Sequence, residues 1–139
     1  MKFLAVRKDG GQESTVTGYW LVEIKSLFSI CLLRFDGKSR RAFHTHAFNC
    51  LSWVLKGRLK ETFFDGRRAD HPASFRPFVT RRSDFHKVDS AEGASWVLTF
   101  RGPWKKHWLE YRPADEEFVT LAEGRQVINR TPYPRLAYQ

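Results

Sequence analysis

Hydrophobic and polar residues alternate over short stretches of the chain, and turn-forming residues separate these stretches. Alternation with a period of two is typical of β-strands that bury one face. The pattern predicts strands at residues 3–7, 18–25, 28–35, 50–56, 58–64, 74–79, 85–89 and 95–100. Pairs such as Asp36-Gly37 and Asp65-Gly66 lie between the strands and favour tight turns. We therefore expect an all-β sandwich or barrel.

Two regions depart from this alternation. Trp104, Trp108 and Tyr111 recur at helical spacing, which predicts a short helix there, although these residue types also suit strands. Two prolines within residues 131–139 predict an extended or flexible C-terminal tail. We expect residues 1–130 to form a single β-barrel domain.

The strands at 50–56 and 95–100 each have two chemically different faces, because successive side chains of a strand point to opposite sides. Small residues alternate with bulky ones: Cys50, Ser52, Val54, Ser95, Val97 and Thr99 against Leu51, Trp53, Leu55, Trp96, Leu98 and Phe100. We expect the bulky faces to pack against a second sheet. The small, partly polar faces would line a cavity inside a barrel.

The composition is that of one packed domain: the 139 residues are 42% hydrophobic and 15% aromatic, which excludes intrinsic disorder. No apolar run approaches the roughly 20 residues of a membrane span, and the apolar block before Arg7 is too short for a signal peptide. The lack of such a run predicts a soluble protein, and Cys31 and Cys50, which make no disulfide framework, fit the reducing cytoplasm.

The chain is strongly basic. Lys and Arg together number 24 against 15 Asp and Glu, a net charge of +9. Such a surplus attracts anions, among them small anionic metabolites, nucleotides and nucleic acid. The sequence lacks a Gly-x-x-x-x-Gly-Lys phosphate loop, a Gly-x-Ser-x-Gly elbow and a Cys-x-x-Cys pair, which excludes the enzyme classes built on those motifs.

His44 and His46 carry the clearest chemical signal. They are separated by one residue and precede the strand at 50–56. An extended backbone would place both imidazoles on one face, where they can chelate one divalent metal together with a third ligand from elsewhere in the chain.

The same segment has the spacing of a known motif. It reads His44, one residue, His46, three residues, Cys50, six residues, Gly57. This resembles the first motif of the cupin superfamily, with Cys50 in the position of the motif glutamate. The resemblance implies a double-stranded β-helix, or jelly-roll barrel, with little helix. His86 is followed by strand-like sequence and is the candidate for the histidine of the second cupin motif.

More narrowly, residues 18–30, the segment from His44 to Asn49 and residues 96–104 are similar to small cupin-type proteins encoded by tailed bacteriophages. This resemblance spans most of residues 14–111 and would place the protein in the host cytoplasm. The cupin resemblance implies that His44, His46 and His86 form a metal site similar to the three-histidine iron site of thiol dioxygenases in that superfamily. Iron is then the expected divalent metal, although imidazole also accepts Zn, Ni or Mn. The implied activity is that of a metal-dependent oxygenase acting on a small anionic substrate, and whether any reaction occurs stays open.

Other residues near the motif are pocket candidates. Cys50 is a fourth ligand, a redox-sensitive neighbour or a small core residue, and Ser52 shares its face. Asn49 either hydrogen-bonds a metal-bound water or caps the turn before Cys50. We expect His71 and His107 to be exposed.

Three charged residues complete the set of candidates. Glu61 is the acidic residue closest to the motif that can point inward, although the interpretation we favour is a surface partner of Lys60 or Arg58. Arg76 and Arg101 would bind a carboxylate or phosphate if they project into the mouth of the barrel.

Two further functions compete with an enzyme. The first is a cupin-shaped binding protein that sequesters a nucleotide-like ligand, and the second is a basic module that docks on nucleic acid or a host protein. Exposed strand edges favour a homodimer in each case.

Overall fold

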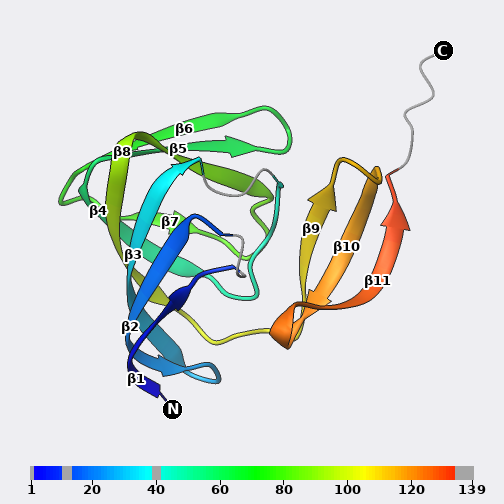
Figure 1. The fold of residues 1–139 in the computed structure, drawn as a ribbon, viewed down its shortest axis with the longest axis horizontal. Helices are drawn as coiled ribbons and strands as arrows, with labels where there is room; N and C mark the ends of the chain where they lie inside the picture. Colours follow the sequence, from blue (N-terminus) through cyan, green and yellow to red (C-terminus); the bar gives the residue numbers. More distant parts are fainter. Residues whose placement is uncertain (1, 11–13, 39–41, 134–139) are drawn as a thin grey trace.

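The computed structural model describes residues 2–10, 14–38 and 42–133, and these form almost entirely antiparallel β-structure (Figure 1). The strands are β1 (Lys2–Lys8), β2 (Val16–Ile24), β3 (Phe28–Lys38), β4 (Cys50–Lys56), β5 (Arg58–Phe63), β6 (Arg68–Pro72), β7 (Phe78–Thr80), β8 (His86–Arg101), β9 (Trp108–Arg112), β10 (Glu117–Ala122) and β11 (Gln126–Pro132). The one helical element within these ranges is a 3₁₀ turn, η1 (Glu123–Arg125). The expected all-β jelly roll with little helix is confirmed.

The long strand β8 organises the larger sheet, whose order is β1-β2-β3-β8-β4-β7 with β5 and β6 attached. The first part of β8 pairs with β5, and its second part pairs with β3 on one side and β4 on the other. One strand thus serves both walls of a barrel, which Figure 1 shows curving around its interior.

A second sheet, in the order β11-β10-β9, stands beside the barrel (Figure 1). Residues 43–45 join it to the barrel, because His44 forms antiparallel bridges with both His86 of β8 and Glu110 of β9. The amide of Thr45 donates to the carbonyl oxygen of Leu109 at 2.8 Å. His44 therefore lies at the junction between the two sheets.

The core fills the barrel with side chains that alternate along the strands. Its buried members are Val16, Trp20, Cys31, Leu33, Val54, Leu59 and Val97. Gly57 makes the turn between β4 and β5 at φ +87°, and a Cβ there would lie 2.3 Å from Ser95 Oγ. The turn thus requires glycine for its backbone conformation and for its close contact with β8.

Most of the predicted strands are confirmed, and the differences have physical causes. The segments at 85–89 and 95–100 belong to the single strand β8. The strand predicted at 74–79 is correct only at its end, where β7 begins at Phe78, because residues 73–77 are an exposed loop between β6 and β7. The helix predicted from Trp104 to Tyr111 is wrong, since β9 begins at Trp108 and pairs with β10. Pairing with a neighbouring strand outweighs a short aromatic spacing pattern.

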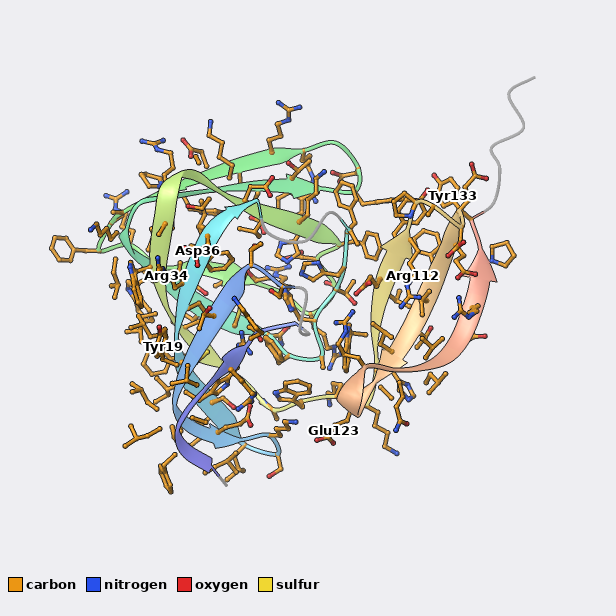
Figure 2. The ribbon with its side chains drawn as sticks, viewed as in Figure 1. Tyr19, Arg34, Asp36, Arg112, Glu123 and Tyr133 are labelled. Carbon is orange, nitrogen blue, oxygen red and sulfur yellow. The ribbon has the colours of Figure 1, made fainter. Side chains whose placement is uncertain are left out.

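The two faces of β4 and β8 do differ as predicted, but the bulky one does not pack against a second sheet. Ser52, Val54, Ser95, Val97 and Thr99 are buried inside the barrel. Leu55 is 56% exposed and Phe100 40% exposed on the outside, where Trp53 packs edge-on against Phe100. Tyr19 shares this outer surface (Figure 2) and lies 5.8 Å from the ring of Trp96. The small residues face inward because the barrel interior is narrow.

At the C-terminal end, Thr131 and Pro132 belong to β11, and residues 134–139 of the expected tail lie outside the described residues. Within the described ranges, no helix has the length and apolar character needed to cross a membrane.

Candidate functional site

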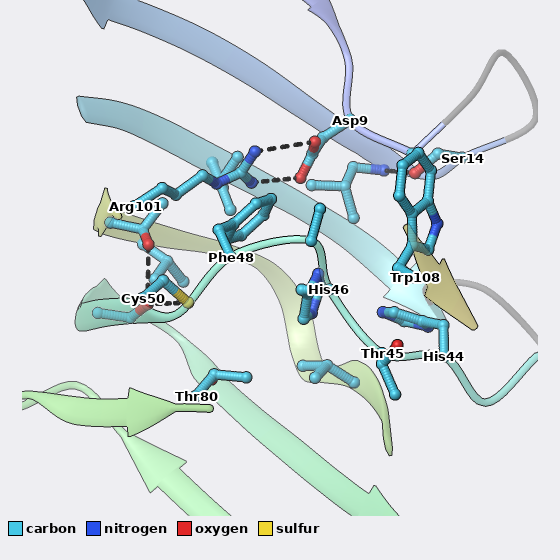
Figure 3. Close-up of a pocket in the computed structure, with 18 of the residues that line it drawn as sticks. Asp9, Ser14, His44, Thr45, His46, Phe48, Cys50, Thr80, Arg101 and Trp108 are labelled. Carbon is cyan, nitrogen blue, oxygen red and sulfur yellow. Dashed lines mark hydrogen bonds and ion pairs between the residues drawn. The ribbon is translucent and has the colours of Figure 1, made fainter. Parts of the chain in front are cut away.

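Three histidines from two distant parts of the chain meet at the junction of the sheets. The potential ligand atoms of His44, His46 and His86 all lie within 4.8 Å of one another. Nε2 of His46 is 3.0 Å from Nε2 of His86. His44 and His46 lie side by side at the cavity in Figure 3.

Backbone pairing explains why these rings meet. Residues paired across an antiparallel bridge direct their side chains to the same face, which brings His44 next to His86. His46 follows two residues after His44 along an extended segment and so shares its side. The centroids of the three rings are 4.9, 5.2 and 5.1 Å apart.

Hydrogen bonds fix which ring nitrogens face the cluster. Nδ1 of His86 donates to Glu61 Oε2, and Nδ1 of His44 donates to the carbonyl oxygen of Ala42 at 3.2 Å. Because a carbonyl and a carboxylate can only accept, both histidines carry the proton on Nδ1. The Nε2 lone pairs are therefore the ones that can bind a metal.

Glu61 is a buried hydrogen-bond acceptor and not the surface partner of Lys60 or Arg58 that we favoured. Its side chain lies between His86 and His71, and His71 Nε2 donates to its second oxygen at 3.0 Å. Burial raises the pKa of Glu61, but the hydrogen bonds from the two histidines outweigh it and lower the pKa to about 2. Glu61 is thus a carboxylate that orients His86.

His71 also departs from its expected exposed position. Its ring stacks on Phe78 with 3.8 Å between centroids, and its side chain is 18% exposed. His107 is exposed as expected. The sequence pattern did not predict a strand at residues 68–72. In the structure this segment is β6, and its pairing with β5 places His71 opposite Leu59 and near Glu61.

The donor set fits a divalent transition metal. Two nitrogens bonded to one ion at about 2.1 Å, at an angle near 90°, lie about 3 Å apart, which is the separation of the His46 and His86 Nε2 atoms. Neutral imidazole is a good ligand for Fe, Zn, Ni and Cu ions. The cluster is therefore compatible with a divalent metal, and its chemistry does not single out one ion.

The cluster opens on a cavity of about 270 Å³ within the barrel. Apolar side chains form much of its wall: Val16, Trp20, Leu33, Phe35, Phe48, Leu59, Phe78, Val88 and Val97. Among the predicted pocket residues, Cys50 and Ser52 line it, and Ser52 Oγ donates to Thr99 Oγ1 at 3.0 Å. Cys50 lies 3.9 Å from Ser52 Oγ and is not part of the histidine group.

Arg101 lines the cavity, where it is buried and paired. Its two terminal nitrogens donate to Asp9 at 3.3 and 2.6 Å, and the guanidinium lies 4.6 Å from the centre of the Phe48 ring (Figure 3). Burial lowers the pKa of Arg101, but the charge of Asp9 raises it further, so the guanidinium stays charged. Phe48 separates this ion pair from His46, with which it stacks.

Besides Glu61, two of the predicted pocket residues do not line the cavity. Asn49 is exposed, and its side-chain oxygen accepts from the amide of Arg82 at 2.6 Å, which ties the start of β4 to the loop after β7. Arg76 is exposed in the loop between β6 and β7, so the prediction that it projects into the barrel mouth is wrong.

Sequence reasoning missed the residues that the second sheet brings to the cavity. Trp108 and Arg125 line it, and so do Lys25 and Trp104 from the segments that follow β2 and β8. Trp104 and Trp108 lie in the segment that was interpreted as a helix, Lys25 ends a predicted strand, and no element was predicted around Arg125, so no pattern pointed to them. Pairing of His44 with Glu110 brings β9 against the histidines.

Comparison with known proteins identifies solved structures that share this fold. A scan against models of protein families finds no match, and neither does a search of curated proteins. Solved structures do match: the polyketide cyclase RemF from Streptomyces resistomycificus has a TM-score of 0.60 at 13% identity, over 71% of this chain and 73% of that one. A cupin-superfamily sugar phosphate isomerase from Silicibacter pomeroyi has a TM-score of 0.58 at 12% identity, over 85% and 76%.

The fold is that of the cupins. A further cupin-type match is the Fe(II) form of HppE, with a TM-score of 0.58 and 14% identity. This chain aligns over 70% of its own length and spans 55% of that chain. Identities this low show a shared cupin architecture and leave the activity to be argued from the site.

Proposed function

We propose that this cupin-fold protein is a metal-dependent enzyme in which His44, His46 and His86 hold a divalent metal, with iron as the first candidate. The observation that supports this is the meeting of three imidazoles, with their ring nitrogens close together, on the wall of a cavity. The substrate would be a small anion, and the reaction class an oxygenation. The resemblance to phage-encoded cupins is part of the same hypothesis, as is a cytoplasmic location.

His44, His46 and His86 would hold a ferrous ion through neutral imidazoles that leave its charge in place, and the ion would supply the capacity to bind a substrate and oxygen together. Side chains of the protein would orient a metal ligand, exclude water and orient the substrate. Glu61 holds the His86 ring in one tautomer. Phe48 and Trp104, packed 5.3 Å apart, cover the wall beside His46 and exclude water. Ser52 and Thr99 offer hydroxyls that can orient a polar substrate group.

Cavity size and charge favour a small anion over a nucleotide. The volume of about 270 Å³ lies just below the roughly 300–1,000 Å³ usual for ligand pockets. The lining carries five cationic side chains, Arg7, Lys8, Lys25, Arg101 and Arg125, and one carboxylate, Asp9. Glu23, Glu110 and Glu123 pair with three of these cations from outside the lining, so the groups that face a ligand are mainly positive and favour an anion.

Metal analysis of protein purified without a histidine tag tests the proposal. We expect near-stoichiometric divalent metal, with loss in His44→Ala and His86→Ala and retention in His107→Ala, whose histidine is exposed outside the cavity. The iron-loaded protein should consume oxygen when its substrate is supplied from a panel of small carboxylates and phosphates. If the untagged protein takes up no metal and both cluster variants match the wild type, the enzyme hypothesis is wrong.

The binding-protein alternative gives a different result. A nucleotide at about 100 times its dissociation constant would add about 2.7 kcal/mol of apparent stability without any metal. A metal-free thermal shift with nucleotides, in the absence of any shift with small carboxylates, would favour that alternative.

A further inference from the structure

Arg125 has a backbone conformation that arginine rarely adopts. It ends the tight turn between β10 and β11, with φ +58°, directly after Gly124 at φ +74°. A side chain in this left-handed region costs energy, which glycine avoids. Such strained residues persist where the surrounding structure holds them, and they concentrate at ligand sites.

The side chain of Arg125 reaches the cavity that the histidines line. Its Nη2 donates to Glu110 Oε2 at 2.8 Å. Glu110 is buried and is paired with His44 across the bridge between the sheets, which sets the two side chains on the same face. The guanidinium is therefore held beside the histidine cluster.

The local charge balance leaves Arg125 able to accept an anion. Glu110 is shared with a second cation, because its Oε1 lies 4.0 Å from Nε of Arg112. Figure 2 shows Arg112 on the three-stranded sheet. One carboxylate between two guanidiniums leaves a net positive charge. The Arg125 side chain is 33% exposed, so a ligand that enters the cavity can reach it.

Three of the other four cations of the cavity are each paired with a carboxylate, and the fourth, Lys8, is exposed and donates to Thr17 Oγ1 at 3.3 Å. Both terminal nitrogens of Arg101 bind Asp9 and its side chain is 5% exposed. Arg7 binds the buried Glu23, and Lys25 binds Glu123 while it lies over the Trp104 ring. Of the five N–H donors of Arg125, the contacts among described residues use one.

We propose that Arg125 is a substrate-binding residue that takes the carboxylate or phosphate group of the substrate, while the remainder of the molecule faces the three histidines. This inference rests on the proposed metal site. A guanidinium presents parallel N–H groups that match two oxygens of either anion. The second sheet, absent from the sequence-based prediction, would then provide the specificity of the site.

The test uses the Co(II)-loaded protein, whose visible spectrum reports ligands at the metal. Sodium acetate and inorganic phosphate are titrated as probes, with acetamide as the uncharged control. The variants are Arg125→Gln, which removes the charge, and Arg125→Gly, which also removes the backbone strain. Arg76→Gln is the matched control, because Arg76 is exposed and lies outside the cavity.

We expect at least a tenfold rise in the Kd of one of the two anions in both Arg125 variants, with wild-type affinity in Arg76→Gln and no change in the response to acetamide. The anion that responds distinguishes a carboxylate from a phosphate substrate. All variants should bind Co(II) as the wild type does.

Three results would overturn the inference in distinguishable ways. If the wild type binds no Co(II), the proposed function fails and Arg125 loses its role with it. If Co(II) binds normally and both anions keep their affinity in the Arg125 variants, the inference alone is wrong. Loss of folding in both variants, measured by circular dichroism, would show that Arg125 is structural, since Arg125→Gly removes the strained conformation.

Discussion

Glu61 accepts a hydrogen bond from Nδ1 of His86, and this contact decides which nitrogen of the ring faces His46. The carboxylate comes from the middle of β5 and the histidine from the start of β8, which are neighbouring strands. A position that sequence analysis placed on the surface thus holds one member of the histidine cluster in place.

Replacing Glu61 should weaken metal binding. In Glu61→Gln the charge that orients His86 is lost, and we expect the metal Kd to rise about 10- to 100-fold. Isothermal titration with Co(II) measures the change. Asp70→Asn on the adjacent strand β6 is the control, because Asp70 pairs with Arg58 at the surface. Equal affinities in the two variants would contradict the orienting role.

The same carboxylate should make stability depend on acid pH. The pKa of Glu61 is lowered to about 2 in the folded protein, below its value of about 4.3 in the unfolded chain. Its contribution is therefore fully present above about pH 5 and is lost as the pH falls toward 2. Urea unfolding at pH 7, 5 and 3 should show the wild type's advantage over Glu61→Gln shrinking between the last two values. A constant difference would count against a lowered pKa.

Gly57 should tolerate substitution far less than Gly66. Both have a positive φ, of +87° and +93°, but a Cβ at Gly57 would strike Ser95, whereas one at Gly66 meets nothing within 4 Å. Gly66→Ala should cost about 1–2 kcal/mol of strain, and Gly57→Ala more than that. Chemical denaturation of the two variants measures the free energies of unfolding. Equal losses of stability in the two variants would mean that Ser95 of β8 moves aside for the added methyl group at little energetic cost.

Asp9→Asn should destabilise the protein strongly. The change leaves the buried guanidinium of Arg101 without its counter-charge, and removing one partner of such a pair costs about 3–5 kcal/mol. Asp65→Asn is the comparison, because its ion pair with Arg67 is exposed to solvent, which screens the attraction between the two charges. Thermal unfolding should separate the two variants clearly; similar melting temperatures would show that Arg101 finds another acceptor.

Much of the barrel follows from the sequence alone. Alternation with a period of two identifies β4 and the second half of β8 and separates their small faces from their bulky ones, because the pleat of a strand makes that alternation local. The spacing of His44 and His46 puts both on one side for the same reason. His86 was selected by a family resemblance, because no local sequence pattern indicates how far it lies from His44 and His46 in the fold.

Tertiary structure decided the rest. Alternation shows that Trp53 and Ser52 face opposite ways, but only the narrow interior of the closed barrel determines that the serine points in. Pairing between distant strands turned Glu61 toward His86 and carried Arg125 to the cavity. Those contacts depend on register across the sheets, which is a property of the assembled fold and leaves no signature in the neighbouring residues.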